Sequence, residues 1–293
     1  MRTGILCLLI ILTAVPRAFS WNGEGHMVVA QLAYNHLNAS VKTQCDTLIA
    51  VPLTFSSTAT NTFVTAACWA DDFKSSLGTS IWHYIDLPFS LDGTSTSGVA
   101  AASFDVVRAI RQCVTTLQST TETQANKATS LRYLIHFVGD IQQPLHASTA
   151  VRAGDLNGDS GGNGFVITGT WSNLHSLWDS GGGFLTDSIT RPLSAAEQSS
   201  INSRVATVEA AYPYVAGPAT IPDPMDWANE GFQLAQTVSY VGITRNGSPS
   251  AGYLNTTQST TQERMAKGGK RLADLLNTIF AATPTTLSAF ELE

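Results

Sequence analysis

Charged residues are scarce in this chain. Aspartate, glutamate, lysine and arginine together make up 13% of its 293 residues, and the formal net charge is −6. This composition argues against a broad basic surface of the kind that binds duplex DNA. It leaves open a local phosphate site built on metal ions, because a bound cation dominates the charge around it. The polar surface must therefore rely on serine, threonine, asparagine and glutamine, as is ordinary in exported proteins.

Long apolar stretches are lacking after residue 20. None approaches the ~18 residues that a membrane-spanning helix needs. Residues 1–20 begin with Arg2, continue through the apolar stretch Gly4–Val15 and end in small residues, which is the pattern of a secretory signal. We therefore expect a signal peptide over residues 1–20, cleavage before Trp21, and one exported domain over residues 21–293. The protein would be secreted, or periplasmic in a Gram-negative bacterium.

Cysteine is rare as well. Loss of the signal peptide would remove Cys7 and leave Cys45, Cys68 and Cys113. An odd number allows at most one internal disulfide, so the chain is not a disulfide scaffold. We predict that Cys45 pairs with Cys68. In a eukaryotic host three sequons could also carry glycans, at Asn38, Asn246 and Asn255.

Strand-like alternation is nearly absent, and helical periodicity dominates the chain. It predicts helices over Glu24–Leu37, Phe104–Leu117, Leu131–Ile141, Ala195–Ala211, Pro224–Val241 and Glu263–Phe280. Gly268-Gly269 is expected to weaken the last of these. Two polar loops, Thr54–Asn61 and Gly154–Gly164, lie between helices, and Ile81–Leu87 and Gly164–Thr168 are expected to be short extended pieces. The pattern predicts a single all-α, mainly helical domain with long loops.

Two of the six histidines begin the same short motif. His136 and His175 each stand four residues before an aspartate, Asp140 and Asp179, and on a helix this spacing places both side chains on one face. His146 follows the first pair closely. Imidazole with carboxylate suits a zinc ion, although a simple His–Asp hydrogen bond on a packed helix would give the same spacing.

A third group of acidic residues and histidine strengthens the metal interpretation. Asp71 stands twelve residues before His83, and Asp72 follows Asp71 directly. Burying such charges without compensation is costly, and a metal ion removes that cost. We therefore predict a multinuclear metal site. His36 has no carboxylate within four residues, and we exclude it from the site.

The loop Gly154–Asn163 has the acidic spacing of a calcium-binding loop. An EF-hand is nevertheless excluded, because Ser160 stands where glycine is needed and Val166 where glutamate is needed. The two glycines before Asn163 can instead bring the backbone and an amide against a phosphate. A flexible surface turn is the alternative.

The chain resembles the S1/P1 nuclease family in six motifs that stand in the family's order: Trp21 with His26, WAD at Trp69–Asp71, HYID at His83–Asp86, HFVGDIQQPLH at His136–His146, GDSGGN at Gly158–Asn163 and NLHSLWD at Asn173–Asp179. They cover roughly the first two-thirds of the mature chain. The resemblance implies the fold shared by phospholipase C and P1 nuclease. It also implies a secreted, zinc-dependent, monomeric enzyme without a stable protein partner. Such an enzyme would cut single-stranded DNA and RNA and remove 3′-phosphates from nucleotides.

The resemblance further implies three zinc ions and their ligands. One ion would take Asp71, His83, His136 and Asp140. A second would take His146, His175 and Asp179. The third would take His26, Asp140 as a bridge, and the free amine and carbonyl oxygen of Trp21.

By the same resemblance, Asp71 is the catalytic residue that orients or deprotonates a water. Lys74 and Asn163 contact phosphate, Tyr84 stacks on a base, and Asp86 hydrogen-bonds the base edge. Phenylalanine is common in the family where Tyr84 stands, which preserves stacking and adds a hydroxyl here.

Two rival functions remain open. A zinc-dependent phospholipase C resembles the fold and the trinuclear site, although Tyr84, Asp86 and the loop before Asn163 favour the nuclease. A zinc-binding protein without catalysis would need neither Lys74 nor Asn163.

Overall fold

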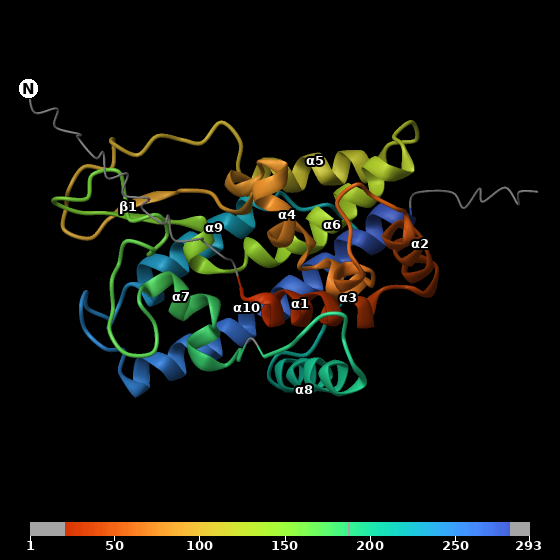
Figure 1. Cartoon of the computed structure of the whole chain (residues 1–293). Helices are drawn as coiled ribbons and strands as arrows, with labels where there is room; N and C mark the ends of the chain where they lie inside the picture. Colours follow the sequence, from red (N-terminus) through yellow and green to blue (C-terminus); the bar gives the residue numbers. More distant parts are fainter. Residues whose placement is uncertain (1–20, 187, 282–293) are drawn as a thin grey trace, which may run out of the picture.

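Two helices at the centre of the fold cross in close contact (Figure 1). The computed structural model describes residues 21–186 and 188–281, so the expected signal peptide over residues 1–20 lies outside the described residues. Helix α1 (Gly23–His36) is almost wholly buried at its start, and α10 (Ala251–Ala281) runs the length of the molecule beside it. The chain is mainly helical, as the periodicity predicts.

The glycine pair in α10 is required by this close packing. A Cβ on Gly269 would lie 2.4 Å from Cβ of Leu32, and one on Gly268 would lie 3.2 Å from Cγ1 of Val29. These glycines therefore have two opposite effects, of which the sequence predicts only the weakening of the helix. They lower helix propensity, but they allow α10 to pack against α1.

A second pair of neighbouring helices carries part of the site. Helix α6 (Gln124–Asp140) is capped by the Thr123 hydroxyl, and α5 (Val106–Gln118) by the Asp105 carboxylate, each accepting a hydrogen bond from a backbone N–H in the first turn. Helix α6 is buried continuously from Leu131 to its end. Its C-terminus therefore delivers side chains into the interior.

The remaining helices wrap around these four. They are α2 (Ala39–Ala50), α3 (Phe63–Ala66), α4 (Trp69–Leu77), α7 (Leu174–Asp179), α8 (Ala195–Ala211) and α9 (Pro224–Leu234). Helix α9 continues as a π-helical turn, Ala235–Ser239. Short 3₁₀ helices occupy Thr58–Thr60, Ser80–His83, Pro144–Ala147 and Gly181–Gly183.

Among the described residues, the two strands lie on one side of the molecule. Strands β1 (Pro88–Ser90) and β2 (Thr149–Val151) form a two-stranded parallel sheet. The prediction of an extended Ile81–Leu87 is wrong at its start, because Ser80–His83 is a 3₁₀ helix, and the predicted Gly164–Thr168 piece contains a single bridge from Val166.

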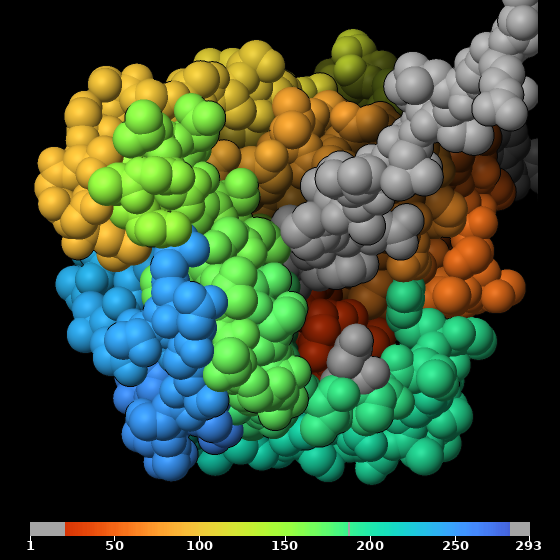
Figure 2. Space-filling model, turned by 60° about the vertical axis from the view of Figure 1, so that its left-hand side comes forward, coloured from red at the N-terminus to blue at the C-terminus, as the bar shows by residue number. Residues whose placement is uncertain are grey.

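The long loops gather beside this sheet. Figure 2 shows yellow and orange residues near β1, green residues of the 154–186 segment and blue residues at the start of α10 side by side on the surface. Beneath them, Phe89, Phe165 and Tyr253 share one hydrophobic cluster. The loops are therefore packed onto an apolar base.

The predicted Cys45–Cys68 disulfide is wrong in this structure. No disulfide joins the two within the described part of the chain. Cys45 packs in the main core with α5 and α6, whereas Cys68 belongs to a separate cluster around Trp21. Cys113 is also a buried thiol, and burial raises its pKa to about 12.

The predicted glycosylation sites lie at the surface. The three sequon asparagines are exposed. Across the described ranges, no helix is both long enough and apolar enough to cross a membrane.

Candidate metal centre

The predicted ligands converge from six segments of the chain. They are His26 in α1, Asp71 in α4, His83 in a 3₁₀ helix, His136 and Asp140 in α6, His146 in the next 3₁₀ helix, and His175 and Asp179 in α7. Except for Asp71, each of these side chains is buried. The structure thus brings together all eight side-chain ligands that the sequence predicts.

The first group surrounds the C-terminus of α6. The Asp140 carboxylate lies 3.2 Å from Nε2 of His136 and 3.0 Å from Nδ1 of His83. Asp71 approaches the same two rings, at 3.7 Å from His136 and 3.6 Å from His83. The predicted set of Asp71, His83, His136 and Asp140 is therefore contiguous.

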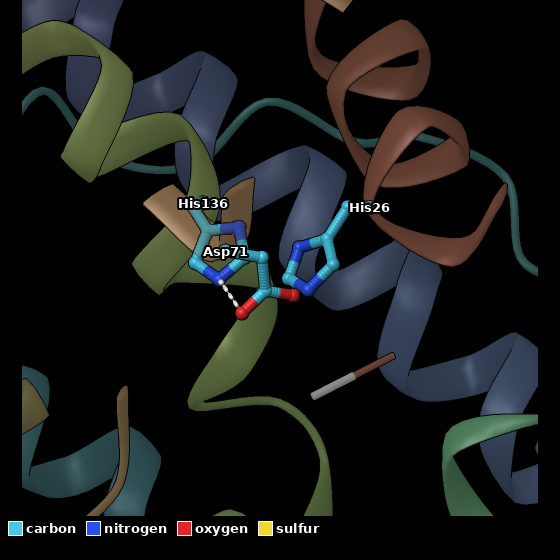
Figure 3. A group of neighbouring side chains, drawn as sticks. All are labelled: His26, Asp71 and His136. Atoms are coloured by element: carbon cyan, nitrogen blue, oxygen red, sulfur yellow. Dashed lines mark ion pairs between the residues drawn. The ribbon is translucent and has the colours of Figure 1, made fainter. Parts of the chain in front are cut away.

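His26 extends this group toward α1. Figure 3 shows the His26 ring from α1 facing Asp71 and His136, and the two imidazoles stack with their centroids 3.9 Å apart. Nε2 of His26 also lies 3.4 Å from Oδ1 of Asp140. Asp140 thus faces His26 with one carboxylate oxygen and His83 and His136 with the other, as a bridging ligand would.

Trp21 is held next to this group. Its indole Nε1 donates to the carbonyl of Gly139 at 3.0 Å, and the next residue, Asn22, donates its backbone N–H to the carbonyl of Asp179 at 3.1 Å. Trp21 is completely buried. These hydrogen bonds therefore hold the start of the predicted mature chain between α6 and α7.

The second group joins α7 to the segment after α6. Nε2 of His146 lies 3.2 Å from Nε2 of His175, which lies 3.5 Å from Oδ1 of Asp179. Gln143 donates to Asp179 at 2.9 Å. This group matches the predicted set His146, His175 and Asp179.

Backbone carbonyls orient three of the imidazoles. Nδ1 of His136, His146 and His175 lies 2.6, 2.8 and 2.7 Å from the carbonyls of Ala67, His83 and Gly161. A carbonyl can only accept, so each Nδ1 carries a proton, and in the neutral form of each ring the lone pair lies on Nε2, which faces the cluster. This outer hydrogen bond is typical of metal-binding histidine.

The electrostatics of the first group favour cation binding. Burial lowers the pKa of His26 to about 3, so its ring is neutral. Burial opposes ionisation of Asp71, but His136, His83 and Lys74 lower its pKa to about 2. Burial also opposes ionisation of Asp140, whose pKa His136 and His83 hold well below the usual range.

Several buried atoms of this cluster lack a hydrogen-bond partner among the described residues. They are both ring nitrogens of His26, Nε2 of His83 and both carboxylate oxygens of Asp140. Buried polar atoms are normally satisfied. Neutral imidazoles and ionised carboxylates are the ligands that zinc takes, so these residues fit zinc ions.

A pocket of about 400 Å³ opens beside His146 and His175. Tyr84, Asp86 and Asn163 line it, as expected for residues that contact one ligand. Burial and then Asp159 raise the pKa of Asp86 to about 6. Lys74, predicted to contact phosphate, is nine-tenths buried and its ammonium lies 2.9 Å from Asp71.

His36 lies outside the cluster, as expected. It occupies the last turn of α1, where it pairs with Glu209 at 2.7 Å and stacks on Tyr214. In the loop Gly154–Asn163, where the sequence excludes an EF-hand, Asp159 is buried and accepts a hydrogen bond from the Tyr240 hydroxyl.

Sequence reasoning missed the groups that orient the ligands. Gln143 and the carbonyls of Ala67 and Gly161 have no distinctive spacing from the histidines they serve. Gln143 does fall inside the HFVGDIQQPLH motif, which is the one signal that could have marked it.

The chain is similar to known proteins over most of its length. The sequence model of the S1/P1 nuclease family matches residues 21–281. Endonuclease 2 of Arabidopsis thaliana is 28% identical over 291 residues, which covers 92% of this chain and 94% of the relative. Nuclease S1 of Aspergillus oryzae is 27% identical, covering 89% and 92%, and nuclease P1 of Penicillium citrinum is 26% identical, covering 88% and 97%.

These matches span nearly the whole described chain, and the zinc-type cluster lies within them. Zinc dependence is a property of the matched family. The chain therefore belongs to the S1/P1 nuclease family of phosphodiester-cleaving hydrolases.

Proposed function

We propose that the chain binds three zinc ions and hydrolyses single-stranded DNA and RNA to 5′-phosphorylated products. It would also release phosphate from 3′-nucleotides. The observation that carries the proposal is a cluster of eight histidine and aspartate residues, seven of them buried. Two of these, His146 and His175, line a pocket together with Tyr84, Asp86 and Asn163.

The three ions would be held by three groups, two of which share Asp140. Asp71, His83, His136 and Asp140 would hold one, and His146, His175 and Asp179 another. His26, Asp140 and the amine and carbonyl of Trp21 would hold the third. The contact of His26 with Asp140 and the burial of Trp21 support this division.

Zinc would supply a water of lowered pKa and positive charge for the phosphoryl oxygens. Asp71 is ionised near neutral pH, because its pKa is about 2, so it can accept a hydrogen bond from the attacking water and orient it. Lys74 and Asn163 would bind phosphoryl oxygens and offset charge that develops there. The Lys74 side chain is buried, and its contact with Asp71 holds the ammonium beside the proposed metal centre.

Tyr84 and Asp86 would select an unpaired base. An aromatic ring stacks on any base, and a single strand offers that face without unpairing a duplex. Asp86 lines the same pocket, from which its carboxylate would hydrogen-bond the base edge. The substrate would therefore be single-stranded, and the charge of the ions lets an acidic protein hold a polyanion.

We also propose that residues 1–20 are removed on export and that the mature protein is a secreted monomer. The apolar pattern of residues 1–20 supports export. Cleavage before Trp21 would create the amine that the third zinc requires, so the precursor would lack a complete site.

The test compares substrates on the mature protein loaded with zinc. Single-stranded DNA, the same sequence as a duplex, a 3′-nucleotide and phosphatidylcholine vesicles are assayed in parallel. We expect the single strand and the 3′-nucleotide to be hydrolysed and the other two to be resistant. Hydrolysis of phosphatidylcholine alone would support the phospholipase C alternative, and hydrolysis of neither class would refute the proposal.

A further inference from the structure

The loop Gly158–Asn163 adopts an unusual backbone. Gly158, Ser160, Gly161 and Gly162 all have positive φ, between 55° and 83°. For Ser160 this left-handed conformation is unfavourable, and a Cβ on Gly161 would lie 2.3 Å from the carbonyl oxygen of Leu145. Such strain persists when the surroundings over-determine the conformation.

Asp159 supplies much of that constraint. It is 2% exposed, and its Oδ1 accepts hydrogen bonds from the backbone N–H groups of Ala150 and Gly162, both at 3.0 Å. The Tyr240 hydroxyl donates to the same carboxylate, at 2.8 Å from Oδ2. One carboxylate thus ties the loop to β2 and to the chain that follows the π-helical turn.

The loop in turn orients a predicted zinc ligand. The Gly161 carbonyl lies 2.7 Å from Nδ1 of His175. It belongs to the same peptide group as the Gly162 N–H, which donates to Asp159. With the proton on Nδ1, Nε2 of His175 presents its lone pair toward His146 and Asp179.

We infer that Tyr240 and Asp159 form a positioning pair that fixes the tautomer and ring orientation of His175, and through it the zinc affinity of the His146–His175–Asp179 group. The inference rests on the proposed zinc centre. It assigns a role to Tyr240, which lies outside the family-like motifs and outside the ligand set.

The Tyr240→Phe substitution tests the pair. It removes the hydroxyl but keeps a ring that packs edge-on against Phe89 and Phe165. Tyr214→Phe is a matched control, because the Tyr214 hydroxyl donates to Asp274 at 2.7 Å in a Tyr–Asp pair on another part of the molecule. Zinc affinity is measured by competition with a chelator of known affinity.

We expect the wild type and Tyr214→Phe to hold three zinc ions. Tyr240→Phe should hold two with unchanged affinity and the third more weakly, by up to the roughly 10- to 100-fold that follows loss of a ligand's own hydrogen-bond partner. In a His175→Ala background, Tyr240→Phe should cause no further loss of zinc affinity. The Nδ1–H resonance of His175 should also broaden or shift in Tyr240→Phe alone.

If Tyr240→Phe does not fold, Asp159→Asn is measured in its place, since it keeps one oxygen acceptor. Three ions bound with wild-type affinity in the folded variant, at lower resistance to urea, would show a purely structural role and overturn the inference. Failure of the wild type itself to bind zinc would refute the proposed centre together with the inference, and the wild-type measurement identifies that case.

Discussion

Asp86 should make the protein less stable as the pH rises. Burial and the neighbouring Asp159 raise its pKa from 3.8 to about 6, so the folded state binds this proton more tightly than the unfolded state. The stability that results is fully present below about pH 4 and is lost as the pH rises through about 6. Above that range Asp86 carries a buried charge that opposes folding.

The Asp86→Asn substitution should remove this penalty. Each pKa unit corresponds to about 1.4 kcal/mol, so a shift of about two units limits the gain to about 3 kcal/mol at pH 7. The variant should show a gain in the free energy of unfolding, relative to the wild type, that grows between about pH 4 and pH 7. Any constant cost of exchanging carboxylate for amide adds equally at every pH.

Urea unfolding of both proteins without zinc, at several pH values, measures this difference. The titration of the histidines affects both proteins alike, so the difference isolates Asp86. A difference that does not change with pH would refute the argument. The expected result would mean that a destabilising carboxylate is retained in the pocket, as at sites that serve binding.

Four further outcomes are expected. Asp140→Ala should remove a ligand from two zinc ions. It should raise the barrier to hydrolysis of single-stranded DNA by several kcal/mol, which lowers the rate more than ~100-fold; near-wild-type turnover would refute its bridging role. One residue added before Trp21 should reduce zinc content toward two ions per chain, whereas one added at the C-terminus should not. Tyr84→Ala should raise KM for single strands by roughly 5- to 150-fold, from about 1–3 kcal/mol of stacking, and Tyr84→Phe should restore it. Gly269→Ala should destabilise the fold by about 1–3 kcal/mol in thermal unfolding, since its methyl group meets Leu32; a stabilised variant would contradict the packing argument.

The strongly periodic helices could be predicted from the sequence. Ala195–Ala211 is found with the predicted bounds, and α1 differs from its prediction by one residue at each end. The first third of α10 was missed because residues 251–262 are rich in threonine and glutamine and lack an apolar stripe. Tyr253, Thr257 and Thr261 are nevertheless buried against the loops, a tertiary contact that periodicity cannot show.

The site, too, could be predicted only in part from the sequence. The spacing of His136 to Asp140 and of His175 to Asp179 marks ligand pairs because four residues of helix place both on one face. Their convergence depends on how α1, α4, α6 and α7 pack, which the family resemblance implies and local spacing does not. The Tyr240–Asp159 contact joins residues 81 positions apart without any motif, and only the folded chain reveals it.

The same limit explains the wrong disulfide. Counting cysteines allows one bridge, but it says nothing about which cores the thiols enter. Cys45 and Cys68 belong to different hydrophobic clusters, and each is buried as a small apolar side chain.

The central claim is a three-zinc centre that hydrolyses single-stranded nucleic acid. The most direct measurement is a titration of the zinc-free mature protein with zinc, in which bound metal and the rate of hydrolysis of single-stranded DNA are followed together. The account predicts that hydrolysis is absent without metal and reaches its maximum at three equivalents of zinc per chain. Full activity at one equivalent, or activity that persists without metal, would contradict it.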